Sequence, residues 1–417
     1  MEEIAALHGE PDWLRKRRRT ALDAFERLPR PSKTDEEWRR TDVSGLDPSA
    51  FGPFEQKNGA APTETLPGKE TAGVLLQHGS QPVSAVLDPE LQRRGVIFTS
   101  LTVAAKDHPE LLQPLLFSQV RPDRDRFSAL HAAFFSGGAF LYVPDGVTID
   151  QPIVSQFWSA EGGTAVLPHT LIVAGRGARF NYLDEYLSPA DEPVGYKSGS
   201  AELFLGEGST VGYVALQKWG RNAWHLADQR ARLDKDATLR LFNVTLGARF
   251  SKTRVEASLQ GQGADAELKA IYFASGEQFF DFHTLQDHQV GNTRSDLLFK
   301  GALQDVARTV YAGLIRIEKG AAHSDAYQAN RNLVLSDHAK ATSIPMLEID
   351  NNEVRCTHGA TVGPVDPQHL FYLRSRGIPE ATAKRMIVQG FFGAVLERIP
   401  FEHARGLIEA ELEARLG

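Results

Sequence analysis

The 417-residue sequence contains a single cysteine, Cys356, and only three methionines. One cysteine excludes a disulfide within the chain, and it excludes a metal site built from several cysteines of this chain alone. No apolar run approaches the roughly 20 residues that a membrane-spanning helix needs. The first residues, MEEIAALHGE, also lack the apolar core of a secretory signal. We therefore expect no membrane insertion and a reducing, cytoplasmic location.

The charge balance gives no general attraction for nucleic acid, because 46 basic residues face 53 acidic ones and the net charge is −7. The basic run RKRRR at residues 15–19 lies in a helical pattern without nearby aromatic or basic support. We interpret this run as the solvated face of a helix. The sequence also has no P-loop, no dinucleotide fingerprint and no G-x-S-x-G motif.

Helical patterns occupy both ends of the chain. Residues 1–135 predict an N-terminal helical region, interrupted by a Pro- and Gly-rich linker at about 47–69. Residues 346–417 predict a C-terminal helical domain, with one helix after Pro379 and a second from 401 onward. These two helices either cap the domain before them or dock a partner, and sequence leaves both interpretations open.

The middle of the chain, residues 139–345, predicts a mainly β fold. Short β-branched and aromatic runs alternate with turns, and a turn followed by a small residue recurs along this region. The recurring turns begin at Gly177, Gly208, Asp236, Gly263, Gly291 and Gly320, which gives steps of 31, 28, 27, 28 and 29 residues. A near-constant period without intervening helices predicts a stacked β-solenoid, or β-helix.

Two polar clusters in the solenoid invite functional hypotheses. Asp281 and His283 share one strand face, with Asp287 and His288 close behind, so a metal site is chemically possible. We favour the alternative that these groups form hydrogen-bonded ladders between coils. A carbohydrate lyase could use the adjacent pair at 184–185, but neighbouring strand residues point to opposite faces and cannot flank one bond.

The segment VRCTHGATVG at residues 354–363 brings Cys356 and His358 together. In an extended loop, residues two positions apart project to the same side, so both side chains could reach one metal ion. His358 could instead activate Cys356 as a nucleophile, or the cysteine could be a buried thiol without chemistry. Two ligands are too few for a closed site, so any further ligands must come from elsewhere, including another chain.

Several segments resemble the SufB/SufD family, the scaffold subunits of the SUF iron–sulfur cluster assembly machine. They are EEWRRTDV, FSALHAAFFSGGAFLYVPDGV, HTLIVAGRGARFNYLDEY, DFHTLQDH, NLVLSDHAKATSIP, and IPMLEI followed by RCTHGATVG and LFYLRSRGI. The similarity spans nearly the whole chain. The HGATVG continuation and the single cysteine resemble the SufD branch, whereas the SufB branch has additional cysteines. Thr357 departs from the family pattern, where a serine often stands.

The resemblance implies a right-handed parallel β-helix flanked by N- and C-terminal α-helical domains. It further implies a non-enzymatic subunit that forms a heterodimer with SufB and docks the ABC-type ATPase SufC on its C-terminal helices. By this resemblance, His358 lies at the SufB–SufD interface and helps to hold a transient iron–sulfur cluster, with Cys356 nearby. No cofactor is expected to stay bound to the chain alone. Alternatives are a homodimeric SufB-like scaffold, a Cys/His-dependent hydrolase and a β-helix carbohydrate lyase.

Overall fold

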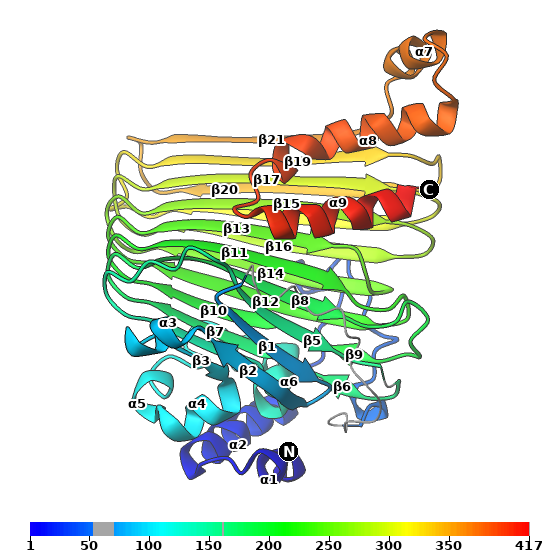
Figure 1. Cartoon of the computed structure of the whole chain (residues 1–417). Coiled ribbons are helices and arrows are strands. Elements are labelled where there is room, and N and C mark those ends of the chain that lie inside the picture. Colours follow the sequence, from blue (N-terminus) through cyan, green and yellow to red (C-terminus); the bar gives the residue numbers. More distant parts are fainter. Residues whose placement is uncertain (53–70, 161, 417) are drawn as a thin grey trace.

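The computed structural model of the chain describes residues 1–52, 71–160 and 162–416. Its centre is a parallel β-helix, with helices gathered at the N-terminal end and further helices along one side toward the C-terminal end (Figure 1). The mainly β prediction, with helical regions on both sides, is confirmed. Most of the predicted linker at 47–69 lies outside the described residues. Within the described residues, no helix combines the length and apolarity needed to cross a membrane.

Two long sheets form the walls of the solenoid in the part of the chain that the structure describes. The ten-stranded sheet contains, in spatial order, β2 (Gln81–Leu87), β1 (Gly73–His78), β5 (Ile153–Trp158), β8 (Arg179–Leu187), β11 (Thr210–Lys218), β13 (Thr238–Thr245), β15 (Asp265–Ala274), β17 (Arg294–Leu303), β19 (Asp325–Val334) and β21 (Arg355–Pro364). The eleven-stranded sheet contains β20 (Lys340–Ile349), β18 (Arg308–Ile317), β16 (Phe279–His288), β14 (Phe250–Leu259), β12 (Trp224–Leu233), β10 (Ser200–Leu205), β7 (His169–Ala174), β4 (Ala139–Val143) and β3 (Ile97–Ser100), with β9 (Tyr196–Lys197) beside β12 and β6 (Ala165–Val166) beside β9. From β10 onward the chain alternates between the two sheets, and each sheet gains one strand per repeat.

The recurring turn of the sequence is the corner where the chain enters the ten-stranded sheet. Its residues Gly177, Gly208, Asp236, Gly263 and Asn292 all have positive φ, between 55° and 77°. Each donates its backbone N–H to a carbonyl in the corresponding turn of the next coil, at 2.8 to 3.1 Å. Glycine, aspartate and asparagine tolerate this left-handed conformation best, which explains why they recur with the period of one coil.

The small residue after each turn faces the lumen of the solenoid. Ala178, Ser209, Ala237 and Ala264 are fully buried there. Coils stack at the strand spacing of about 4.8 Å, so a larger side chain at one of these corners would collide with its equivalents above and below. The rest of the lumen is filled by a continuous apolar core that includes aromatic side chains such as Tyr213. The repeat in the sequence is therefore a packing requirement.

The N-terminal region closes one end of the solenoid. Its helices are α1 (Glu2–His8), α2 (Asp12–Arg27), α3 (Pro89–Arg93), α4 (Leu101–Asp107), α5 (Pro109–Leu112) and α6 (Arg126–Phe134), with short 3₁₀ helices η1 (Glu36–Trp38) and η2 (Pro48–Ala50). The region also contains β1, β2 and β3, which sequence analysis did not separate from the helices. Strand β1 pairs in parallel with β5, so it extends the solenoid wall.

The basic run at 15–19 is only in part the solvated face that we expected, because Lys16 and Arg19 are exposed whereas Arg18 is not. Arg18 is fully buried, and its guanidinium pairs with the buried carboxylate of Glu10 at 2.6 Å. The same guanidinium donates to the backbone carbonyls of Ala133 and Phe135 and lies 3.7 Å from the centre of the Phe135 ring. Arg17 donates to a backbone carbonyl at Leu116. The run anchors α2 to α6 because its long stems and donors satisfy carbonyls at the end of that helix.

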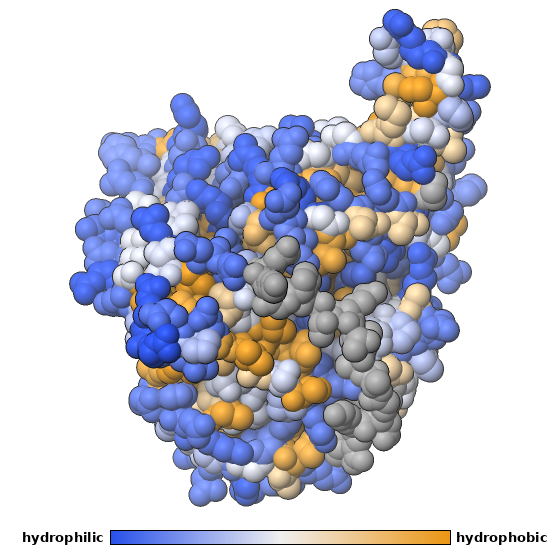
Figure 2. All heavy atoms as spheres, viewed as in Figure 1, coloured by the Kyte–Doolittle hydropathy of each residue, from blue (hydrophilic) through white to orange (hydrophobic). Residues whose placement is uncertain are grey.

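The C-terminal helices are α7 (Pro367–Ser375), α8 (Glu380–Leu396) and α9 (Glu402–Leu416), which confirms the two helices predicted after Pro379. Helices α8 and α9 lie across the outer face of the ten-stranded sheet (Figure 1). Phe392 and Ile408 pack there against Phe242 and Ile271. Helix α7 projects away from the solenoid (Figure 1), and Figure 2 shows apolar atoms among polar ones on this projecting part. Phe371 on α7 is 74% exposed.

Candidate functional site at the end of the solenoid

The C-terminal end of the solenoid is formed by two strands that lack a neighbour on one side. Strand β20 is the terminal strand of the eleven-stranded sheet, and β21 is the terminal strand of the ten-stranded sheet. Both are ten residues long and largely exposed along their length. Long unprotected edge strands are templates for pairing with another chain, and natural proteins usually cover or shorten them. This end of the solenoid is therefore a surface suited to a partner.

The segment with Cys356 and His358 is strand β21 itself and not the loop that the sequence suggested. Glycines at 359 and 363 lower the strand propensity of this segment, but its parallel pairing with β19 holds it as a strand. In the register, Cys356 lies beside Ala326 and His358 beside Gln328, and both partners are fully buried in the lumen. Because side chains alternate along a strand, Cys356 and His358 share the inward face of the last coil.

The thiol of Cys356 is half-buried. It packs with Val354 against a small apolar cluster that includes Ile315 and Ala326. Burial, with a further contribution from the carboxylate of Asp325, raises the pKa of Cys356 to about 11. The thiol is consequently protonated near neutral pH, which argues against its use as an activated nucleophile. Coordination to a metal would require a positive charge at the site to displace the proton.

The imidazole of His358 is exposed. Among the described residues it has no side-chain hydrogen bond or ion pair. Directly beneath it in the register, the buried side chain of Gln328 donates from Nε2 to the carbonyl of Gly313 at 3.1 Å. The Oε1 atom of Gln328 is buried and has no hydrogen-bond partner in the described structure. An inward-turned His358 ring could donate to that oxygen and leave its second nitrogen free for a metal.

Sequence analysis missed Gln328, although a signal for it exists. Every second residue of β19 points into the lumen, and three of these four residues have amide side chains: they are Ala326, Gln328, Asn330 and Asn332. Amide side chains at every second position of a strand indicate that buried polar groups line one of its faces. In β19 this face lies directly beneath β21.

Cys356 and His358 offer two metal donors of different softness, a thiol and an imidazole. No group of three or more His, Cys, Asp or Glu side chains in the described residues is arranged to hold a metal ion. Cys356 and His358 are therefore not joined by a third such side chain in the part of the chain that the structure describes. The inward face of an uncovered terminal coil can present these donors to a second chain that supplies the rest.

The histidines at 283 and 288 brace the fold. Both ring nitrogens of His288 are engaged, with the hydroxyl of Thr293 at 2.7 Å and that of Ser295 at 2.8 Å. Thr293 continues the ladder to Ser324 on the next coil at 2.9 Å. The ladder that we favoured is therefore confirmed for His288.

The Asp281–His283 pair belongs to an ion-pair network. His283 Nε2 lies 3.1 Å from Asp281 Oδ1, and the Lys252 ammonium lies 2.5 Å from the other carboxylate oxygen. Burial alone would raise the pKa of Asp281, but Lys252 and His283 together hold it well below its ordinary value. The hydroxyl of Thr41 also donates to this carboxylate and ties the N-terminal segment to the solenoid. The Lys252 ammonium therefore provides the positive charge that balances the Asp281 carboxylate, in the place where a metal ion would otherwise do so.

The adjacent carboxylates at 184 and 185 point to opposite faces, as expected. Asp184 lies in the lumen and accepts a hydrogen bond from Tyr213 at 2.7 Å. Glu185 accepts from Gln156 at 2.5 Å. Burial raises the pKa of Asp184 to about 7. The two carboxylates cannot act on one glycosidic bond, which removes the geometric basis of the lyase hypothesis.

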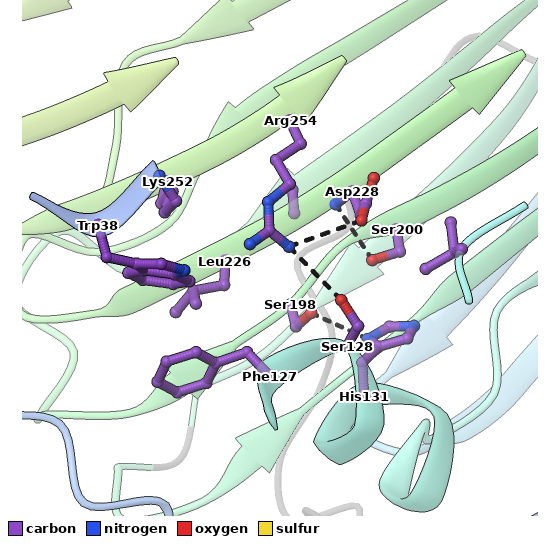
Figure 3. Close-up of a pocket in the computed structure, with 12 residues that line it drawn as sticks. Trp38, Phe127, Ser128, His131, Ser198, Ser200, Leu226, Asp228, Lys252 and Arg254 are labelled. Atoms are coloured by element: carbon purple, nitrogen blue, oxygen red, sulfur yellow. Dashed lines mark hydrogen bonds and ion pairs between the residues drawn. The ribbon is translucent and has the colours of Figure 1, made fainter. Parts of the chain in front are cut away.

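A buried polar cluster joins the N-terminal region to the eleven-stranded sheet (Figure 3). The guanidinium of Arg254 pairs with Asp125 and Glu37 and lies 3.7 Å from Asp228, and the imidazole of His131 lies 2.9 Å from the hydroxyl of Ser198. The cavity among these groups is only about 20 Å³. That is room for a water molecule and not for a substrate. The cluster thus fixes the N-terminal region on the solenoid.

The fold and the site define a class: a parallel β-solenoid flanked by helices, whose terminal strand presents a thiol and an imidazole on one face. Residues 157–391 match the SufBD core domain of SUF-system FeS cluster assembly, and residues 83–154 match the SufBD protein N-terminal region. The chain belongs to the SufBD family of iron–sulfur cluster assembly proteins, and it is SufD-like.

Curated relatives match along nearly their whole length. The chain is 29% identical to the iron–sulfur cluster assembly protein SufD of Bacillus subtilis, over 100% of this chain and 97% of that protein. It is 28% identical to a SufBD family protein of Staphylococcus saprophyticus, over 100% of this chain and 93% of that protein. A Staphylococcus aureus SufBD family protein is 27% identical with the same coverage. The expected resemblance is confirmed.

Proposed function

We propose that this chain is the SufD-like subunit of a cluster assembly complex and acts as a non-enzymatic scaffold. In this proposal it pairs with a SufB-type chain through the open end of its solenoid. A transient iron–sulfur cluster, the cargo of the complex, forms at that interface with His358 and Cys356 among its ligands. The supporting observation is the placing of Cys356 and His358 on the inward face of β21, a terminal strand with one free edge. We further propose that the complex works in the cytoplasm, where the lone thiol stays reduced.

The test is reconstitution of the chain with a SufB-type partner, iron and sulfide. The variant His358→Ala should lower cluster formation, measured by visible absorbance, while the two subunits still co-elute. His108→Ala is the matched control, because His108 is a partly exposed histidine between α4 and α5, in the N-terminal region at the other end of the solenoid (Figure 1). Equal cluster yields for the wild-type chain and His358→Ala would contradict the assigned role of His358.

Two alternatives make different predictions. A homodimeric scaffold should assemble a cluster from this chain alone, without the SufB-type partner. A Cys/His hydrolase needs an accessible thiolate, and the raised pKa of Cys356 opposes it. The heteromeric scaffold is favoured over the hydrolase for this reason. Cluster formation that depends strictly on the second chain would separate it from the homodimer.

We also propose that the SufC-type ATPase docks on the C-terminal helices. A depression of about 270 Å³ lies between α8 and α9, with Phe392 and Leu412 at its base and Glu409 and Glu413 at its rim. An apolar base with a charged rim is the usual anatomy of a protein interface.

Deleting these helices would be a poor test, because it would uncover the apolar face of the ten-stranded sheet. The double variant Glu409→Lys and Glu413→Lys changes only exposed side chains, and we expect it to abolish co-purification of the ATPase. Glu402→Lys, at a 92% exposed carboxylate where α9 begins, is the matched control. Undiminished ATPase binding by the double variant would assign these helices to packing alone.

A further inference from the structure

A groove of about 470 Å³ lies where the N-terminal segment crosses the beginnings of β12, β14, β16 and β18. It is far in sequence from β21, and neither the donor pair nor the C-terminal helices line it. Its cationic lining residues are Lys33, Arg39, Arg40, Arg249 and Arg308. Only two carboxylates, Asp42 and Glu277, share the lining. A cationic groove is unexpected on a chain whose net charge is −7.

The four arginines of this groove are not neutralised within the described structure. No carboxylate in the described residues lies within ion-pair distance of any of them, whereas Lys33 lies 3.8 Å from Asp42. Arginines on the opposite sheet behave differently: Arg240 and Arg294 both pair with Asp265, at 2.7 and 3.2 Å. Clustered like charges repel one another, so a bound anion would stabilise this groove.

One wall of the groove is aromatic. Trp224, Phe250 and Phe279 occupy the same register position on three successive coils, and their ring centroids are 4.9 and 5.5 Å apart. Arg308 takes the next place in this column, beside Phe279. Trp224 and Phe279 remain partly exposed. A column of aromatic side chains thus adjoins an array of guanidinium groups.

We propose that this groove binds a nucleoside phosphate. Guanidinium groups bind phosphate oxygens through paired, charge-assisted hydrogen bonds, and an aromatic wall favours a planar base. A simple inorganic anion would make no use of the aromatic column. The groove volume lies within the usual range of about 300–1,000 Å³ for small-molecule sites. This site is independent of the function proposed above and uses arginines in place of the glycine-rich loops that the sequence lacks.

The experiment is isothermal titration of the purified full-length chain with ADP, inorganic pyrophosphate and adenosine, each in magnesium-free buffer. ADP should bind most tightly, because it alone engages both the arginines and the aromatic wall. The double variant Arg249→Ala and Arg308→Ala should weaken ADP binding at least 10-fold. Phe279→Leu should weaken ADP binding while leaving pyrophosphate binding unchanged.

Arg179→Ala is the matched control, since Arg179 is an exposed arginine at the start of β8 on the other sheet. A thermal melt establishes that the variants are folded, which we expect because the substituted arginines have no partner to lose. The proposal is overturned if ADP shows no saturable binding or if ADP binds no better than pyrophosphate. It is equally overturned if the arginine double variant and the Arg179 control bind ADP like the wild-type chain.

Discussion

The thiol of Cys356 should react slowly with alkylating agents. Its pKa of about 11 compares with an ordinary value of 9.0. At pH 8 the thiolate fraction of an ordinary cysteine is about a tenth, and that of Cys356 is about a thousandth. Because the thiolate is the reacting species, alkylation of Cys356 should be about 100-fold slower than that of a model thiol, before any steric effect of burial.

The assay follows incorporation of iodoacetamide by mass spectrometry, and the single cysteine makes the label specific to one site. The sign of the pH dependence follows from the raised pKa. The neutral thiol persists up to about pH 11, so the logarithm of the rate should rise linearly from pH 7 to 9.5 without a plateau. An ordinary thiol begins to level off near pH 9. A plateau below pH 8.5, or a rate equal to that of glutathione, would refute the reasoning and restore the nucleophile hypothesis.

Three further predictions concern Gln328, Arg18 and Asp184. Gln328→Leu removes the unpaired amide oxygen beneath His358 together with the hydrogen bond from Nε2 to the carbonyl of Gly313, so reconstituted cluster yield should fall several-fold while the two subunits still co-elute; an unchanged yield would deny Gln328 a positioning role. Arg18→Met leaves the carboxylate of Glu10 buried without its partner and should cost about 3–5 kcal/mol in urea unfolding, and a loss below about 1 kcal/mol would contradict this anchor. Asp184 has a folded-state pKa of about 7, above the unfolded value, so its contribution to the free energy of unfolding falls as the pH rises from about 4 through 7. Asp184→Asn should therefore raise the free energy of unfolding more at pH 8 than at pH 5. An equal effect at both pH values would contradict the raised pKa of Asp184.

The solenoid could be predicted because its determinants are local and periodic. Each coil needs one residue with positive φ followed by one small lumen residue. This requirement produces recurring residue pairs in the sequence, such as Asp236-Ala237 and Gly263-Ala264. The C-terminal helices could be predicted equally well, because apolar residues recur along α8 with the helical period. In both cases the requirement lies within one turn or one element, so a short window of sequence contains it.

What could not be predicted depends on contacts between distant segments. The period of α2 marks a helix, but it does not show that Arg18 meets carbonyls more than 100 residues away at Ala133 and Phe135. The residues of β21 alone predict a loop, because two glycines lower their strand propensity. The segment forms a strand because it pairs with the edge of β19, which lies about 30 residues earlier in the chain. That Cys356 and His358 point to the same side was nevertheless predictable, because alternation holds for any extended segment, whereas the inward direction follows from the pairing with β19.

The protonated thiol bears directly on how a shared cluster could be released. In the proposed function, Cys356 binds iron only when the positive charge of the metal displaces its proton, so binding liberates a proton and becomes stronger as the pH rises. When the partner withdraws, two ligands remain, and burial next to Asp325 again favours the neutral thiol. A low-pKa cysteine at this position would retain its charge and its metal. In the proposed function, the apolar surroundings of Cys356 therefore favour transfer of the cluster over storage, and the exposed imidazole of His358 would make the first contact because it needs no comparable desolvation to bind.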